Sequence, residues 1–126
     1  MKRAKELRRK IRHFRIRKRI VGTSQRPRIC VHKTLKHLYV SVVDDMSQPD
    51  KGCLTLVNMT TNREDNKSKG KKSFCNIPEA KSLGQSVGKA LLEKGIKNAV
   101  FDRAGYLYHG CIKAIAESIR EVGVKI

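Results

Sequence analysis

Acidic residues are almost missing from the first 28 positions of this 126-residue sequence, where Glu6 is the only one. The same segment holds 13 lysines and arginines, so it carries 13 − 1 = +12 of the formal net charge of +18. With so few acids to pair with them, these cations are poorly explained as the solvated face of an ordinary helix. Concentrated positive charge repels itself unless a polyanion neutralises it, so the segment predicts a phosphate-rich partner.

Other absences narrow the class of protein. The chain has no tryptophan, and its apolar runs fall well short of the roughly 18 residues that a membrane span needs. None of the cysteines, Cys30, Cys53, Cys75 and Cys111, forms a C-x-x-C pair, and the four histidines show no metal-ligand spacing. We therefore expect no membrane, metal, cofactor or small-molecule substrate. The thiols are expected to stay reduced, with Cys30 and Cys53 as small core residues.

The polyanion is expected to be nucleic acid, because each lysine or arginine placed on a phosphate releases condensed counterions. The basic arm, residues 1–27, has helical character, with Leu7, Ile11 and Phe14 spaced as one narrow apolar stripe. Like charges three and four residues apart destabilise an isolated helix, so we expect the arm to fray in the free protein and to order on RNA. No serine precedes Ser24, which makes an organelle transit peptide the less favoured interpretation.

The rest of the chain, residues 28–126, is expected to form a single α/β domain. Alternating apolar residues and turn signals predict three strands, at 28–33, 38–44 and 53–59. A polar, lysine-rich stretch at 60–76 predicts a flexible loop. Then follow a helix from the cap residue Asn76 to Gly95, a strand at 99–102, and a helix from about Tyr108 to Val122 that ends at Gly123. The predicted order after the arm is β-β-β-α-β-α.

This order predicts a mixed β-sheet of about four strands with helices packed on it, because a helical crossover makes the fourth strand parallel to one of the others. Residues 99–102 are apolar on both faces, which favours a central strand. Gly84 and Gly88 have neither the spacing nor the position of a phosphate-binding loop, and we expect them to bring their helix close to the sheet. The expected buried helix faces are Ala80, Leu83, Val87, Ala90 and Leu91, and Ile112, Ile115, Ala116 and Ile119.

Three acids mark an alternative function. Asp44 and Asp45 lie at the end of the second predicted strand and Asp102 at the end of the fourth, so the fold could bring them together. Clustered carboxylates can hold two magnesium ions for phosphodiester hydrolysis, which predicts a metal-dependent nuclease of the ribonuclease-H type. The favoured interpretation is structural: Asp44 and Asp45 begin a polar turn, and Asp102 pairs with a neighbouring base or caps the following loop.

A second candidate site lies between residues 101 and 110, where a buried strand turns on a glycine and leads into a helix. Arg103, Tyr106, Tyr108 and His109 supply charge, stacking faces and polar tips in one short segment. This combination is used against unpaired RNA bases and riboses. The alternative is that the tyrosines wedge helix against sheet, and we expect one of the two to do so.

Several motifs occur in an order that resembles a known family. After the arm come Gly22-Thr23, Arg26-Pro27-Arg28, Lys36-His37-Leu38-Tyr39 and Val42-Val43-Asp44-Asp45. The series continues with Glu93-Lys94-Gly95-Ile96, Val100-Phe101-Asp102-Arg103, Gly105-Tyr106 and Tyr108-His109-Gly110. Over nearly its whole length the chain resembles the bacterial-type large-subunit ribosomal protein eighteen family. It departs from that family's usual glycine, lysine and arginine at Ala104, Leu107 and Cys111.

The resemblance implies a ribonuclease-H-like sheet without the enzyme's catalytic set. It implies a structural protein of the large ribosomal subunit, monomeric when free, that binds 5S rRNA and helps to attach it to 23S rRNA beside neighbouring proteins of the central protuberance. The implied location is the ribosome of the bacterial cytosol, with the plastid stroma as an alternative. Together with the charge pattern, it gives as expected RNA-binding residues Arg8, Arg9, Arg12, Arg15, Arg17, Lys18, Arg19, Arg26, Arg28, Lys36, His37, Arg103, Tyr106, Tyr108 and His109.

Overall fold

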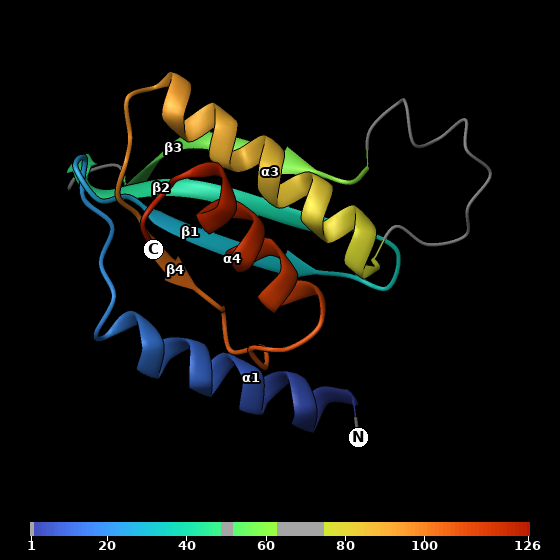
Figure 1. Cartoon of the computed structure of the whole chain (residues 1–126). Helices are drawn as coiled ribbons and strands as arrows, with labels where there is room; N and C mark the ends of the chain where they lie inside the picture. Colours follow the sequence, from blue (N-terminus) through green and yellow to red (C-terminus); the bar gives the residue numbers. More distant parts are fainter. Residues whose placement is uncertain (1, 49–51, 63–74) are drawn as a thin grey trace.

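A computed structural model describes residues 2–48, 52–62 and 75–126 (Figure 1). The predicted order of a helical arm followed by β-β-β-α-β-α is confirmed. The predicted loop at 60–76 lies mostly outside the described residues, and its ends belong to the last strand residue and the helix cap. The elements are α1 (Lys2–Arg17), β1 (Arg28–Lys33), β2 (Leu38–Gln48), β3 (Gly52–Thr60), α3 (Ile77–Glu93), β4 (Val100–Asp102) and α4 (Cys111–Val122).

The four strands form one mixed sheet in the order β3-β2-β1-β4. β2 pairs antiparallel with both β1 and β3, and β4 pairs parallel with β1, as the crossover rule predicts. The predicted central position of β4 is wrong, because β4 is a short edge strand. Its apolar residues are explained by the arm, since Ile16 and Ile20 line the same hollow as Val100 and Phe101.

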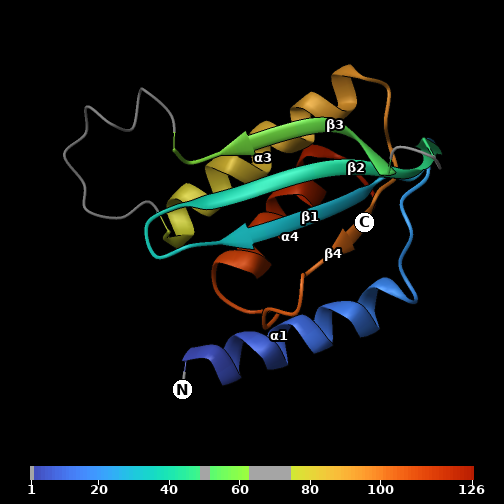
Figure 2. The same cartoon turned by 180° about the vertical axis from the view of Figure 1, so that it is seen from behind.

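Helices α3 and α4 lie side by side on one face of the sheet, and α1 lies along the β4 edge (Figures 1 and 2). The core between the sheet and the two helices contains Ile29, Val40 and Val42 from the strands. The predicted helix faces are buried, except that Ala90 is half-buried. Within the described part of the chain, no helix has the length and apolar character to cross a membrane.

Cap residues set the ends of these helices. The Asn76 side chain accepts a hydrogen bond from the Glu79 amide at 3.0 Å, so the predicted start of α3 is confirmed. Helix α4 begins at Cys111 and not near Tyr108, because Gly110 has a φ of 62°, which a right-handed helix does not accept. Gly123, with a φ of 116°, ends α4 as predicted.

Gly84 and Gly88 bring α3 close to α4, and not to the sheet as expected. A Cβ atom on Gly84 would lie 2.7 Å from the Ile115 carbonyl oxygen and 2.8 Å from the Ser118 Cβ. A Cβ atom on Gly88 would lie 3.0 Å from the Val122 Cβ. The two helices therefore pack at a distance that only glycine permits at position 84.

We predict that Gly84→Ala destabilises the protein by about 1–3 kcal/mol, because the added methyl group meets α4 backbone. Alanine is the better helix former by roughly 1 kcal/mol, so a purely local effect would have the opposite sign. Urea denaturation measures the change, with Gln85→Ala, at an exposed position of the same helix, as the control expected to be near neutral. A Gly84→Ala protein as stable as the control would show that α3 and α4 separate at no cost.

Candidate nucleic-acid interface

Helix α1 docks on the loop between β4 and α4 through charged side chains. The Arg9 guanidinium donates to the Ala104 carbonyl at 3.0 Å, and the Arg12 Nε donates to the Gly105 carbonyl at 3.1 Å. Arg9 also lies over the ring of Tyr106, 4.7 Å from its centre, in cation–π geometry. We expected the arm to fray in the free protein, but the structure shows a continuous helix from Lys2 to Arg17. The contacts with the loop supply stabilisation that the sequence of the arm lacks.

The predicted apolar stripe of the arm does not face the core. Leu7, Ile11 and Phe14 are 60%, 44% and 72% exposed. No described residue of α1 is fully buried, and the half-buried ones are Arg9, His13 and Ile16. The docking face of the arm is therefore mainly cationic, which the apolar periodicity of the arm does not predict.

Gly105 allows this close approach. Its φ is +80°, in the left-handed region, and a Cβ atom there would overlap the carbonyl oxygen of Arg9. The preceding residue, Ala104, also has a positive φ, of 52°, and its amide donates to Asp102 Oδ1 at 2.8 Å. The loop backbone is thus shaped so that two of its carbonyl groups point at the arm.

A buried arginine connects the strands beside the docked helix. Arg28, 5% exposed on β1, donates from Nε to Asp45 Oδ2 on β2 at 3.0 Å and from its terminal nitrogen to Asp102 Oδ2 on β4 at 2.8 Å. Asp45 also accepts from the Gly22 amide at 2.8 Å and lies 3.7 Å from the Arg17 guanidinium. Asp45 and Asp102 therefore serve both the sheet and the arm.

The titration of these groups reflects their pairing. Burial alone lowers the pKa of Arg28, but its hydrogen bonds to Asp45 and Asp102 outweigh this and raise the pKa above its ordinary value. Burial raises the pKa of Asp45, but the hydrogen bonds from Arg28 and Gly22 and the charges of Arg28 and Arg17 together hold it below the ordinary 3.8. Both groups are therefore charged at neutral pH.

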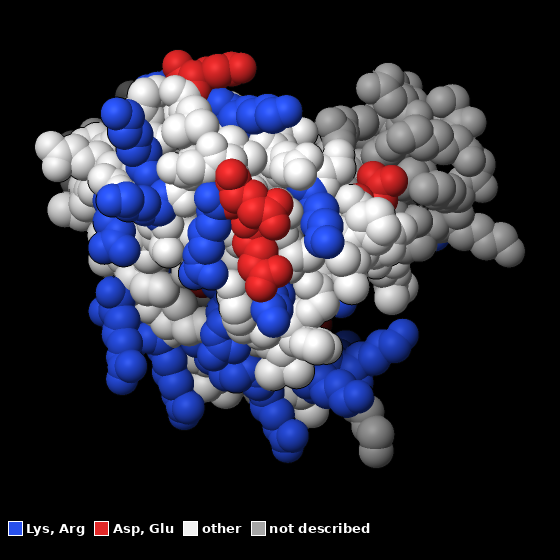
Figure 3. All heavy atoms as spheres, in the orientation of Figure 1, with Lys and Arg blue, Asp and Glu red and all other residues white. Residues whose placement is uncertain are grey.

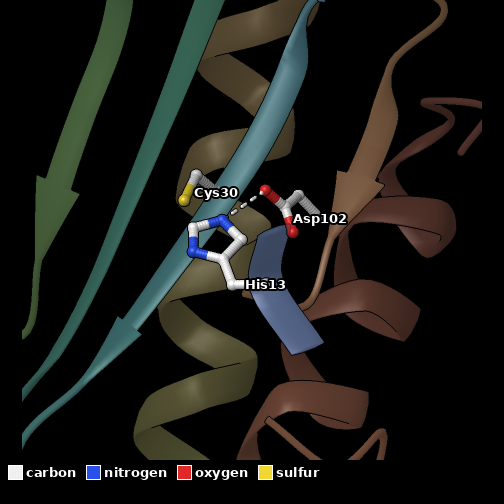
Figure 4. A group of neighbouring side chains, drawn as sticks. All are labelled: His13, Cys30 and Asp102. Atoms are coloured by element: carbon white, nitrogen blue, oxygen red, sulfur yellow. Dashed lines mark hydrogen bonds and ion pairs between the residues drawn. The ribbon is translucent and has the colours of Figure 1, made fainter. Parts of the chain in front are cut away.

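His13 attaches α1 to the same network (Figure 4). Its Nε2 lies 3.1 Å from Asp102 Oδ2, and the thiol of Cys30 lies beside the pair, with the three ligand atoms within 4.8 Å of one another. Burial, and then the Asp102 charge, raise the pKa of Cys30. Cys30 is half-buried, and not the core residue expected, while the Cys53 side chain lies outside the described residues.

The geometry of the His13–Cys30–Asp102 cluster favours a hydrogen bond between His13 and Asp102 over a metal site. Asp102 Oδ2 already accepts from Arg28, and Asp102 Oδ1 accepts from the Ala104 amide. A metal ion would also lie next to the Arg28 guanidinium, whose charge repels it. We therefore assign the cluster to the attachment of α1.

The three acids of the nuclease alternative do not form a carboxylate cluster. Arg28 lies between Asp45 and Asp102, so a cation already occupies the position between the two carboxylates. Asp44 is buried, and its Oδ1 accepts from the Met46 amide at 3.0 Å. Because β2 continues to Gln48, Asp44 and Asp45 lie within a strand and do not begin a turn as expected. Asp102 was expected either to pair with a neighbouring base or to cap the following loop, and it does both, because it accepts from Arg28 and from the Ala104 amide.

Most of the second candidate site serves to build the β4–α4 loop. Arg103 donates to the Tyr106 carbonyl at 2.7 Å. The Tyr106 hydroxyl accepts from the Lys33 amide at 3.2 Å. The ring of Tyr108 packs edge-on against Phe101, and its hydroxyl accepts from Arg120 at 3.2 Å. Both tyrosines pack, where we expected one.

The remaining predicted residues divide by exposure. His37 is half-buried, with Nδ1 3.3 Å from the Thr61 hydroxyl. Arg28, in the buried network, does not lie on the surface. The exposed members of the predicted set are Arg8, Arg12, Arg15, Arg17, Lys18, Arg19, Arg26, Lys36, Tyr108 and His109.

Sequence reasoning missed the network around Arg28. One signal in the sequence was the glycine at position 22. The structure explains it, because the chain returns closely to β2 there and a Cβ atom would lie 2.6 Å from the Val43 carbonyl oxygen. A second was the survival of Asp45 and Asp102 in a chain of charge +18. Neither signal identifies Arg28, among 29 lysines and arginines, as the buried partner.

The fold and this interface define a small basic α/β domain that carries a cationic helix docked along one edge of its sheet. Comparison with known proteins then identifies the family. Residues 2–126 match the family model described as ribosomal L18 of archaea, bacteria, mitochondria and chloroplasts. The chain belongs to this ribosomal L18 family, and it is a ribosomal protein and not an enzyme.

Curated relatives agree over nearly the full length. The chain is 47% identical over 125 residues to the large ribosomal subunit protein uL18 of Dictyoglomus thermophilum, covering 99% of this chain and 98% of that protein. It is 43% identical over 124 residues to the uL18 proteins of Thermotoga petrophila and Bacillus mycoides, with 98% of this chain and 97% of each relative covered.

We predict that Gly105→Ala releases the arm, because its methyl group overlaps the Arg9 backbone. Trypsin should then cut within residues 2–19 roughly 5- to 30-fold faster, as expected if opening becomes easier by about 1–2 kcal/mol. The control is Gly95→Ala, since Gly95 has a similar φ of +77° but no atom within 4 Å of an added Cβ. Equal cleavage of both variants would mean that strain, and not lost docking, is responsible.

We predict that Asp45→Asn lowers stability by about 3 kcal/mol at pH 7, because it removes one partner of a buried pair. The folded pKa of Asp45 lies below 3.8, so its contribution is fully present above that value and is lost as the pH falls through the folded pKa. Melting temperature against pH should therefore fall less steeply below pH ~4 in Asp45→Asn than in the original protein. Glu6→Gln, at a 60% exposed side chain, is the control.

Proposed function

We propose that this ribosomal protein binds 5S rRNA through the outer face of helix α1 and helps to attach it to 23S rRNA in the central protuberance. As a member of the L18 family, it is a structural constituent of the large ribosomal subunit. The proposed partners are 5S rRNA, 23S rRNA and neighbouring proteins of that subunit, and the proposed setting is the bacterial ribosome. The observation that carries the proposal is that some cations of the arm contact the rest of the chain, whereas others are exposed to solvent and available to phosphate.

The docked face of α1 uses some of the cations. Arg9, Arg12 and Arg17, together with His13, contact carbonyl or carboxylate groups of the rest of the chain. Carbonyl acceptors carry no net charge, so two of these contacts leave the arm's charge unneutralised. Docking therefore fixes the helix without removing its attraction for phosphate.

The outer face keeps exposed cations. Within the described residues, no acidic side chain pairs with Arg8, Arg15, Lys18 or Arg19. Figure 3 shows lysine and arginine side chains projecting along the edge formed by α1, whereas the acidic side chains in this view lie over α3 and α4. This asymmetry favours contact between RNA and the α1 edge over contact with the helical layer.

The β4–α4 loop supports selectivity for one RNA. His109 is exposed next to the docked arm, and Leu107 beside it is 77% exposed. Phosphate contacts are the same on every RNA, whereas side chains that reach bases, riboses or the shape of a junction distinguish one RNA from another. We assign affinity to the outer face of α1 and selectivity to His109.

We predict that the triple variant Arg15→Gln, Lys18→Gln, Arg19→Gln weakens binding to 5S rRNA and flattens its salt dependence. The slope of log K against log salt should fall by roughly two, somewhat under one for each lost phosphate contact. Gel-shift titrations of the full chain at several salt concentrations measure this. His109→Ala should lower affinity for 5S rRNA by about 1–3 kcal/mol and leave tRNA binding almost unchanged.

The matched control removes the same charge from helix α3. Lys81, Lys89 and Lys94 lie exposed on or next to it, and their triple change to glutamine should leave the slope almost unchanged. An equal loss in both triple variants would reduce the interaction to attraction by net charge. Equal competition by tRNA and 5S rRNA for the original protein would contradict 5S selectivity.

A further inference from the structure

Two cysteines lie at the same end of the helical layer. Cys75 directly precedes the cap residue of α3, and Cys111 is the first residue of α4. The helices run in the same direction (Figure 1), with Gly84 beside Ile115 and Gly88 beside Val122. Their N-terminal ends are therefore adjacent, and with them the two thiols.

The two side chains are in direct contact. The Cys75 thiol is hydrogen-bonded to the Cys111 thiol, and both are reduced. Cys111 is 9% exposed and belongs to the core, whereas Cys75 is half-buried and packs against it. Burial, and then the neighbouring Cys111, raise the pKa of Cys75, so less of this thiol is thiolate at neutral pH and its reaction should be faster at a higher pH.

Solvent reaches this pair through an open, basic hollow. The hollow has a volume of about 1050 Å³, and both cysteines line it. Lys5, Arg9 and Lys33 also line it, with no aspartate and only Glu6 as an acid among the described lining residues. A small anionic reagent is therefore attracted to the Cys75 side of the pair.

We infer that Cys75 and Cys111 are a modification site that forms a reversible disulfide when a small-molecule disulfide is the oxidant. The thiolate of Cys75 attacks one sulfur of oxidised glutathione, whose S–S bond breaks and releases one glutathione thiolate. The thiolate of Cys111 then attacks the Cys75 sulfur and releases the second. Two protein thiols are oxidised, one glutathione disulfide is reduced, and the two thiol protons pass to the departing glutathiones.

The product joins the starts of α3 and α4 and closes the loop between residues 75 and 111. A disulfide needs a sulfur–sulfur distance of about 2.05 Å, and the two thiols are already near enough to each other to hydrogen-bond. Closing a loop of this length restricts the unfolded chain, so the oxidised protein should melt roughly 10–15 °C higher. This inference is independent of the proposed RNA binding.

The test incubates the folded full chain with oxidised glutathione at pH 8, alkylates the remaining thiols, and maps the peptides by mass spectrometry. We expect a cross-link between the peptides of Cys75 and Cys111, with the mass of two hydrogen atoms lost, and its reversal by dithiothreitol. Cys30 is the internal control, because its neighbours in the described structure are His13 and Asp102 and not a thiol. The double variant Cys30→Ser, Cys53→Ser should form the same cross-link and show the same rise in melting temperature.

Three results would overturn the inference. The first is full alkylation of both cysteines after oxidation of a protein that circular dichroism shows to be folded. The second is a stable glutathione adduct on Cys75 without the cross-link, which would mean that Cys111 cannot reach it. The third is the same yield of cross-link in urea-unfolded protein, which would remove any role of the folded contact.

Discussion

The buried guanidinium of Arg28 is the constraint on which the sheet end and the arm both depend. β1 lies between β2 and β4, so an arginine on β1 can reach a carboxylate on each neighbour, and Asp45 and Asp102 are those carboxylates. Burying a charge is costly unless it is paired and hydrogen-bonded, which makes the three residues interdependent. Each acid keeps further acceptor capacity, and Gly22 and His13 use it. The arm is therefore attached to a network that already holds three strands together.

The docked arm shows how a strongly cationic helix can be fixed without being neutralised. Its contacts through Arg9 and Arg12 go to backbone carbonyl groups, which satisfy directional hydrogen bonds but carry no net charge. Among the described contacts of α1 with the rest of the chain, those of His13 and Arg17 are the ones that go to carboxylates. A helix held in this way presents its outer cations in a fixed row, and this lowers the ordering cost of binding a phosphate backbone. If the arm binds rRNA as proposed, its affinity should depend on the placement of the exposed cations more than on the number of basic residues in the arm.

The sequence predicted the parts of the fold that depend on local signals. Three features follow from such signals. Helix capping predicts the start of α3 at Asn76, apolar periodicity predicts the buried faces of α3 and α4, and the helical crossover predicts the parallel pairing of β4. The errors arose where tertiary contacts override local pattern. β4 looked central because it is apolar, but it is an edge strand whose half-buried Val100 and Phe101 line a hollow together with Ile16 and Ile20 of the arm. The periodicity of the arm predicted a helix with the stripe of Leu7, Ile11 and Phe14, but it did not predict which face docks. The stripe is exposed, and the cations Arg9 and Arg12 contact carbonyl groups of the β4–α4 loop.

The network of Arg28, Asp45 and Asp102 also explains why this sheet does not form the metal site of a nuclease. Carboxylates on neighbouring strands hold catalytic metal ions when their negative charges face each other with no cation between them. Here Asp45 and Asp102 do face one position, but the guanidinium of Arg28 occupies it with hydrogen bonds to both. The guanidinium offsets one of the two negative charges and occupies the place of a metal ion, and the remaining acceptor capacity is directed at the arm. The sheet end that could have been an active site is instead the anchor that orients the cationic helix.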